Sequence, residues 1–217
     1  MRIVARRLTF TYPRVRRPVL QRLDFEVPAH CSAAIVGPSG SGKTTLVSLM
    51  GGLLAPQSGD FACVDSQGTH YAPRDVATWI LQTVSLLPDR SVEDNVRIGA
   101  YLDGTSRKEA AKRAAEALEE VGLAERAHDH ARVLSGGEAQ RVAIARALVS
   151  HRPVIFADEP TGNLDQENTD RVLDALLASG KRTVVLVTHD EQAAARCDLT
   201  FRMSHGTLVP APVRASQ

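Results

Sequence analysis

Cysteine is scarce in this sequence, and long apolar runs are absent. The three cysteines, Cys31, Cys63 and Cys197, are odd in number and show no Cys-x-x-Cys spacing. They therefore predict neither a disulfide framework nor a zinc site, and they fit a reducing compartment. No stretch approaches the roughly 18 apolar residues that a transmembrane helix needs, so we expect no direct membrane insertion.

A signal peptide is not indicated either. Arg2, Arg6 and Arg7 interrupt the N-terminal segment, which lacks the apolar core that such a peptide requires. Internal repeats and low-complexity tracts are missing as well. We therefore look for function in short motifs.

The net charge is close to zero. At a formal charge of +1, no electrostatic excess directs the whole chain to nucleic acid or anionic lipid. Arg14, Arg16 and Arg17 form one small basic cluster between Pro13 and Pro18. For this cluster a solvated loop is favoured over a phosphate-binding patch.

What remains is an ordinary globular composition. Hydrophobic residues make up 43% of the 217 residues and charged residues 24%. This length and composition fit a single compact domain, spanning residues 1–217, with a buried core.

Three short apolar runs, all rich in β-branched residues, predict buried strands of a parallel or mixed sheet. They are Ser32–Val36, Pro153–Ala157 and Thr183–Val187. The N-terminal segments Leu8–Tyr12 and Leu23–Val27 alternate in polarity and predict antiparallel strands.

Polar, reactive residues follow each of the three apolar runs. Gly37 opens a glycine-rich stretch, Asp158 and Glu159 follow the second run, and His189 and Asp190 follow the third closely. Ligands bind beyond the carboxyl ends of the strands in open α/β sheets. We therefore expect these ends to converge on one site.

A helical region separates the first strand-and-helix unit from the second. Its clearest helix starts at Ser106–Glu109, which has the pattern of a capping box, and Gly122 is expected to stop it. One stripe of this helix is apolar and comprises Ala110, Ala114, Ala117, Leu118 and Val121.

The glycine-rich stretch Gly37–Thr44 has the pattern of a phosphate-binding loop, between a strand and a predicted helix at Thr45–Leu54. Its glycines allow backbone N–H groups to turn inward and form an anion nest. Lys43 is expected to reach the β- and γ-phosphates, and Thr44 to hold Mg²⁺. The alternative is a glycine- and serine-rich turn without a ligand.

Two adjacent carboxylates at the end of a buried strand are costly unless a cation or proton chemistry uses them. We expect Asp158 to order Mg²⁺ and Glu159 to polarise the attacking water. The alternative is that Asp158, Glu159 and Pro160 only open a surface loop.

A second helix begins at Leu134–Glu138 and predicts a second anion site. Ser135 and Glu138 fit a capping box, which is the purely structural interpretation. Gly136 and Gly137, however, weaken the first turn by about 1 kcal/mol each relative to alanine, which suits close approach of a ligand to the backbone. Because one phosphate cradle is already present, this helix is expected to face the nucleotide of another copy.

Together these motifs resemble the nucleotide-binding domains of ABC transporters along almost the whole chain. The Leu134–Glu138 signature lies between the phosphate loop and Asp158, as in that family. The resemblance implies an α/β fold with a P-loop NTPase (RecA-like) core, an N-terminal antiparallel β subdomain and an inserted α-helical subdomain at about residues 89–150.

The resemblance also assigns residues that the patterns alone do not. Gln82 matches the glutamine that contacts Mg²⁺ and senses the permease, and Asp165 matches the loop at the dimer seam. His189 matches the switch histidine at the γ-phosphate, although Thr188–Glu191 also fits a capping box. Tyr12 lies where an aromatic stacks on adenine, and an ordinary strand aromatic remains the alternative.

The segment Ala157–Asp165, with Leu86–Pro88 after the glutamine, resembles a narrower branch of the family. That branch contains macrolide exporters, lipoprotein-release ATPases and the cell-division ATPase, which drive permeases mechanically.

The expected function is therefore an ATPase that binds ATP and Mg²⁺. The expected catalytic residues are Glu159, His189, Lys43 and Gln82. The expected metal ligands are Thr44, Gln82 and Asp158. The expected nucleotide-binding residues are Tyr12, Gly37, Pro38, Ser39, Gly40, Ser41, Gly42, Lys43, Thr44, Thr45, Ser135, Gly136, Gly137, Glu138 and Asp165.

Two copies, or one copy and a paralogous ATPase, are expected to enclose two ATP molecules. This dimer is expected to drive a separate integral membrane permease from the cytoplasmic face of the cell membrane. No nucleic-acid partner is expected. The alternative is a soluble ABC ATPase that acts on nucleic acid or the ribosome; such proteins usually carry tandem cassettes, coiled coils or basic insertions, and none is visible here.

Overall fold

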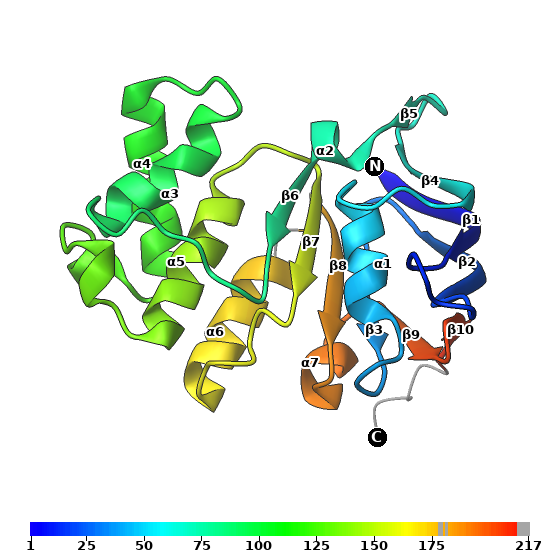
Figure 1. Cartoon of the computed structure of the whole chain (residues 1–217). Helices are drawn as coiled ribbons and strands as arrows, with labels where there is room; N and C mark the ends of the chain where they lie inside the picture. The colour runs from blue at the N-terminus through cyan, green and yellow to red at the C-terminus, as the bar shows by residue number, and fades with distance from the viewer. Residues whose placement is uncertain (178–179, 181, 212–217) are drawn as a thin grey trace. The chain divides into compact units, whose positions relative to one another are not determined.

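A computed structural model describes residues 1–177, 180 and 182–211 of the chain. The chain forms two compact units (Figure 1). The first comprises Met1–Trp79, Pro153–Asp158 and the described residues of Gly180–Gln217. The second comprises Ile80–Arg152 and the described residues of Glu159–Ser179.

The first unit contains an antiparallel sheet with the strand order β2-β1-β4-β5. Its strands are β1 (Arg2–Phe10), β2 (Leu20–Val27), β4 (Ser58–Val64) and β5 (His70–Tyr71). Alternating burial along β1 and β2 confirms the predicted antiparallel N-terminal strands. Tyr12, however, lies beyond the end of β1 and is not a strand residue.

A second, mostly parallel sheet has the strand order β10-β9-β3-β8-β7-β6. Its strands are β3 (Ser32–Val36), β6 (Ala77–Ile80), β7 (Val154–Asp158), β8 (Thr183–Thr188), β9 (Leu199–Ser204) and β10 (Thr207–Pro210). Strands β3, β7 and β8 are the three predicted apolar runs, and every residue of the three is buried. β3 and β7 both pair in parallel with β8, which confirms the predicted parallel core.

The core of this unit is apolar and partly aromatic. Trp79 stacks on Phe156 of β7 with ring centroids 4.4 Å apart, and Phe61 lies against the same ring. Helix α1 (Lys43–Met50) adds Leu46 and Met50 to this core. The short helices α2 (Pro73–Val76) and α7 (Glu191–Ala195) complete the unit.

Helix α1 is shorter than predicted. The expected helix Thr45–Leu54 was wrong at its end, because α1 stops at Met50 and Gly51 and Gly52 follow it. Gly52 has a φ of +69°, a conformation that glycine adopts readily and that terminates helices.

The second unit is helical. Its elements are α3 (Val92–Tyr101), α4 (Arg107–Glu120), η1 (Ala124–Arg126), η2 (Ala131–Val133), α5 (Gly136–Leu148) and α6 (Gln166–Leu177). The predicted stripe on α4 is buried, and α3 packs closely on α5 at Gly99. A methyl group at Gly99 would lie 2.0 Å from the carbonyl oxygen of Arg146, so only glycine permits this approach.

The predicted caps of α4 and α7 are only partly correct. Ser106 caps α4 by accepting a hydrogen bond from the backbone N–H of Glu109, but the Glu109 carboxylate pairs with Arg113 instead of completing a capping box. For α7, the alternative cap at Thr188 was wrong, because Asp190 is the residue that caps this helix. None of the helices in the described part of the chain combines the length and hydropathy needed to cross a bilayer.

Candidate functional site

The parallel core brings three of the predicted strand ends to one edge of the sheet. Val36 of β3 pairs with Thr188 of β8, and Asp158 of β7 pairs with Val187. Because these strands are parallel and in close register, the residues that follow them leave the sheet at the same edge. The phosphate loop, Asp158 and His189 therefore share this edge, as the sequence predicts.

The phosphate loop joins β3 to α1 in the expected way. Gly42 is the N-terminal cap of α1 with a φ of +108°, so the amide groups at the start of the helix have no side-chain cap. Lys43 folds back over the loop, and its Nζ donates hydrogen bonds to the carbonyl oxygens of Gly37 at 2.7 Å and Pro38 at 3.2 Å. The ammonium group is therefore held at the loop, near the amides of the helix terminus.

Two further observations show that these residues fit a triphosphate. The hydroxyl of Ser41 is buried and has no hydrogen-bond partner among the described residues, so the loop keeps a polar group available. The first turn of α1 contains no acidic residue that would repel an anion. Uncapped amides, a lysine and an unused hydroxyl form a donor set suited to phosphate oxygens.

The chemistry of Thr44 and Asp158 also fits a magnesium ion. Thr44 is exposed in the first turn of α1, and the Asp158 carboxylate is 7% exposed at the end of β7. Magnesium is held in proteins by hydroxyl, carboxylate and phosphate oxygens. Both residues belong to the first compact unit.

Glu159 directly follows Asp158 and adopts an unusual backbone conformation. Its φ is +47°, a left-handed value that costs a non-glycine residue about 1 kcal/mol or more. Such strain is concentrated at functional sites, where the surrounding structure maintains it.

Tyr12 is oriented by two contacts. Its ring packs edge-on against Phe10, with centroids 4.9 Å apart, and its hydroxyl lies 3.2 Å from the hydroxyl of Thr45 in α1. Tyr12 is 39% exposed, so part of the ring is available to a ligand. The structure thus connects this aromatic to the helix that follows the phosphate loop.

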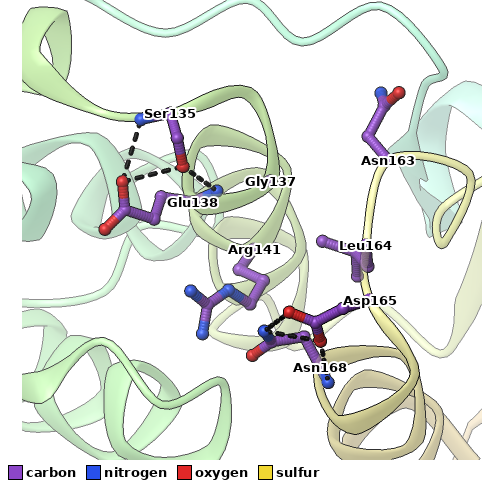
Figure 2. A pocket seen from close by; sticks show the side chains of 8 residues that line it. All are labelled: Ser135, Gly137, Glu138, Arg141, Asn163, Leu164, Asp165 and Asn168. Carbon is purple, nitrogen blue, oxygen red and sulfur yellow. Dashed lines mark hydrogen bonds between the residues drawn. The ribbon is translucent and has the colours of Figure 1, made fainter.

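The second unit contains the other predicted anion site. Ser135 and Glu138 form the complete capping box at the start of α5, as predicted. Both residues line a pocket of about 410 Å³. Figure 2 shows further lining residues, from Asn163 to Asn168, on the neighbouring segment across from them. The Asp165 carboxylate accepts hydrogen bonds from the backbone and side chain of Asn168, and this lowers its pKa.

A sequence profile of the ABC transporter family matches residues 20–162. The chain belongs to the ABC transporter family. It is the ATP-binding and ATP-hydrolysing subunit of such a transporter.

Two relatives and one solved structure illustrate the likeness. The lipoprotein-releasing system ATP-binding protein LolD 1 of Rhodopirellula baltica is 40% identical, over 95% of this chain and 96% of that protein. The macrolide export ATP-binding/permease protein MacB of Rhodopseudomonas palustris is also 40% identical, over 95% of this chain but 33% of that protein. The ATP-binding cassette MJ0796, a post-hydrolysis dimer with ADP and Pi, superposes with a TM-score of 0.86 at 28% identity, over 99% of this chain and all of that one.

In this ABC subunit, Gln82 lies in an exposed segment after β6, in the second compact unit.

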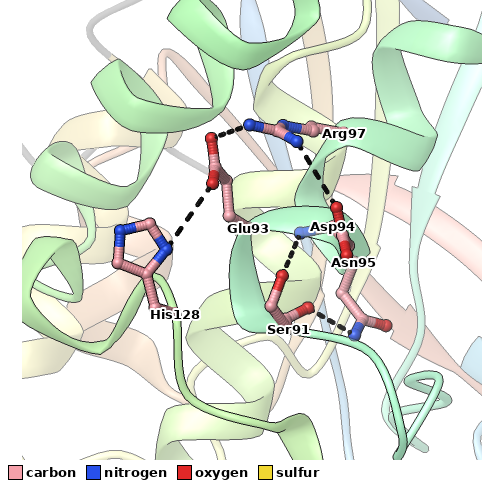
Figure 3. Close-up of polar contacts among 6 residues, drawn as sticks. All are labelled: Ser91, Glu93, Asp94, Asn95, Arg97 and His128. Carbon is pink, nitrogen blue, oxygen red and sulfur yellow. Dashed lines mark hydrogen bonds and ion pairs between the residues drawn. The ribbon is translucent and has the colours of Figure 1, made fainter.

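A buried asparagine, Asn95, holds the end of this segment, although no sequence motif indicates it. Asn95 of α3 accepts a hydrogen bond from the backbone N–H of Leu87 and donates to the carbonyl oxygens of Leu87 and Ser91. Figure 3 shows its amide beside Ser91, next to the ion pairs that Glu93 makes with Arg97 and His128.

Sequence reasoning missed two further supports of the ABC site. The turn His205–Gly206, between β9 and β10, lies against the phosphate loop. Arg126 at the end of η1 pairs with Glu138 of the signature helix. The turn His205–Gly206 and Arg126 belong to no sequence motif, because each acts through a contact with a segment that is distant in the sequence.

Proposed function

We propose that two ABC ATP-binding subunits enclose ATP between the phosphate loop of one copy and the signature helix of the other. One observation carries this proposal: besides the uncapped N-terminus of α1, the chain has a second helix N-terminus that opens with two glycines, at α5 beside a pocket. Only α1 is preceded by a phosphate loop. The glycines and serine before α5 then serve the nucleotide bound by the partner copy, with Asp165 at the seam.

Each residue of the site has a role in this proposal. Lys43 and the loop amides compensate the charge of the β- and γ-phosphates, and Tyr12 stacks on the adenine. Thr44, Asp158 and Gln82 hold Mg²⁺, which supplies charge neutralisation at the γ-phosphate when bound. The remaining cofactor-site residues, from Gly37 to Thr45, shape the cradle.

Hydrolysis needs an oriented water molecule and a group that accepts its proton. Glu159 takes the proton as the water oxygen bonds to the γ-phosphorus and the bond to ADP breaks. His189, which leaves the sheet at the same edge as the phosphate loop, contacts the γ-phosphate. The products are ADP and inorganic phosphate.

We further propose that residues 1–217 act as one ABC ATP-binding domain, with a helical subdomain at about residues 89–150. Dimer closure drives an integral membrane permease at the cytoplasmic face of the membrane. The macrolide export relative, whose printed name joins ATP binding with a permease, supports this partner. The lipoprotein-releasing relative supports an export or mechanical role.

The substitution Glu159→Gln tests the proposal. ATP binding should be retained, hydrolysis should fall about 10²- to 10⁴-fold, and an ATP-dependent dimer should accumulate in light-scattering measurements. Glu167→Gln, at a carboxylate that is 87% exposed on α6, is the matched control and should hydrolyse ATP normally. Normal turnover of Glu159→Gln would reject the base assignment, and a protein that stays monomeric with ATP would reject the paired site.

A further inference from the structure

The signature helix carries a negative charge where an anion is expected to bind. Glu138 is the third residue of α5, and its carboxylate lies in the first turn, close to the amides that the proposed function assigns to the partner copy's nucleotide. A carboxylate free to turn toward the pocket would repel a triphosphate. The following inference rests on that proposed function.

Glu138 lines the pocket, but one oxygen of its carboxylate is bonded to Ser135. Oε2 accepts hydrogen bonds from the backbone N–H of Ser135 at 2.8 Å and from its hydroxyl at 2.9 Å. Figure 2 shows the carboxylate turned back toward Ser135, on the side of the helix away from Asn163. This arrangement leaves the other oxygen, Oε1, to be held by a different group.

Arg126 is the cation next to that second oxygen. Its Nη1 lies 3.5 Å from Oε1 of Glu138. Its Nε lies 2.7 Å from Oδ2 of Asp129, and this second contact is an ion pair that lacks the alignment of a hydrogen bond. The Glu138 side chain is 21% exposed, so the pair is only partly screened by water.

Two arginines, Arg126 and Arg141, contribute positive charge near the Glu138 carboxylate. The hydrogen bonds from Ser135, and then the positive charges of Arg126 and Arg141, keep the pKa of Glu138 below its usual value. Arg141 is itself committed to the carbonyl oxygens of Val121 and Gly122. Arg126 is therefore the arginine whose ion pair holds Glu138.

We propose that Arg126 is a positioning residue for ATP hydrolysis: it helps to anchor Glu138 in the capping box, so that the carboxylate stays bonded to Ser135 and does not extend toward the partner copy's phosphates. Arg126 itself does not contact the nucleotide. Without it, Oε1 loses its cation and only the bonds from Ser135 to Oε2 hold the carboxylate. The carboxylate then leaves the capping box more often, and its charge opposes the approaching phosphates.

A double-mutant cycle tests this role. Arg126→Ala should raise the KM for ATP about five- to tenfold, with less effect on kcat, because the repulsion acts on nucleotide capture between copies. The effect should shrink as salt concentration rises. Arg126→Lys should restore most of the affinity. In a Glu138→Gln background, where no charge needs holding, Arg126→Ala should leave the KM of that background unchanged.

The control is Arg132→Ala. Arg132 makes a more exposed ion pair with Asp89 in the same unit and has no ion pair with Glu138, so its removal should not change the KM. Thermal unfolding of all variants should shift little, because exposed ion pairs contribute about 1 kcal/mol or less. An equal KM increase in both backgrounds, or a KM increase that follows the loss in Tm, overturns the proposal.

Failure of this inference is distinguishable from failure of the proposed function. If Glu159→Gln forms the ATP-dependent dimer but Arg126→Ala behaves like wild type, only the role of Arg126 is rejected. If Glu159→Gln does not dimerise with ATP, the shared nucleotide site itself is rejected.

Discussion

The backbone N–H of Gly206 donates a hydrogen bond to the carbonyl oxygen of Ser41 at 3.2 Å. This bond joins the turn between β9 and β10 to the phosphate loop. Gln21 holds the turn from the other side, because its backbone N–H donates to the carbonyl oxygen of Gly206 and its side chain to that of His205. The loop that receives the phosphates is thus supported by a segment more than 160 residues away in the chain.

The substitution Gly206→Ala should damage both stability and ATP binding. A methyl group at Gly206 would lie 2.2 Å from the carbonyl oxygen of Val19, so the turn must move off Val19, and this movement should disturb its bond to Ser41. We expect a loss of about 2–3 kcal/mol in the free energy of unfolding and weaker ATP binding in calorimetry.

The control for this prediction is Gly68→Ala in the same unit. Gly68 has a similar φ of +83°, against +77° at Gly206, but open space around it. Gly68→Ala should lose only about 1 kcal/mol in the free energy of unfolding, which is the cost of the left-handed conformation for alanine, and it should bind ATP normally. Equal effects of the two substitutions would show that the contact with the loop is unimportant.

Tyr12 should contribute to ATP binding mainly through its ring. Tyr12→Ala removes the stacking surface and should weaken ATP binding by about 1–3 kcal/mol. Tyr12→Phe keeps the ring and loses only the contact with Thr45, so a smaller loss of about 1 kcal/mol is expected. Thr45→Val should match Tyr12→Phe, and the pair should be non-additive in fluorescence titrations with a labelled ATP analogue. Unchanged binding by Tyr12→Ala would reject the stacking role.

Asn95→Ala should destabilise the helical unit by about 1–3 kcal/mol, because Asn95 is fully buried and the substitution removes the partner of the Leu87 N–H. The carbonyl oxygens of Leu87 and Ser91 lose one bond each but keep a backbone N–H donor. Urea unfolding measures this loss. Gln166→Ala is the comparison, since Gln166 is exposed and, among the described residues, its side chain bonds only to Asp170 one turn away. A similar, small loss in both variants would contradict the structural role of Asn95.

The contact between Asp198 and Ser32 should make stability depend on pH. The backbone N–H and the hydroxyl of Ser32 donate hydrogen bonds to Oδ2 of Asp198 at 2.7 and 2.8 Å, and these bonds lower the pKa of the carboxyl group. A carboxyl group with a lowered pKa in the folded state stabilises the protein above its unfolded pKa, about 4. The stabilisation is lost as the pH falls through the lower folded-state pKa.

Asp198→Asn should therefore be less stable than wild type at pH 7, by about 1 kcal/mol at this partly exposed position. In thermal unfolding, the difference should shrink as the pH falls below about 4 and should disappear below the lower folded-state pKa of Asp198. A difference that persists unchanged in acid would show that the charge of Asp198 is not the cause.

The local motifs were predictable because their chemistry lies within a few residues. Gly37–Thr44 needs only its own glycines and Lys43 to form a cradle, and the capping box at Ser135 is complete within four residues. The errors occurred where a weak local preference competed with a neighbouring one. At the end of α1, Gly51 and Gly52 outweighed the apolar residues Leu53 and Leu54, and at α7 Asp190 capped the helix in place of Thr188.

The amino-acid sequence by itself determined the parallel core, the phosphate loop and the two helix N-termini, because strand hydrophobicity, glycine conformation and helix capping act over short stretches of chain. Only the tertiary structure decided which distant groups support them. The bond from Gly206 to Ser41 and the ion pair of Arg126 with Glu138 depend on segments brought together by packing. Such contacts leave no periodic pattern, since each needs one correctly placed backbone or charged group, and only the folded chain specifies where that group lies.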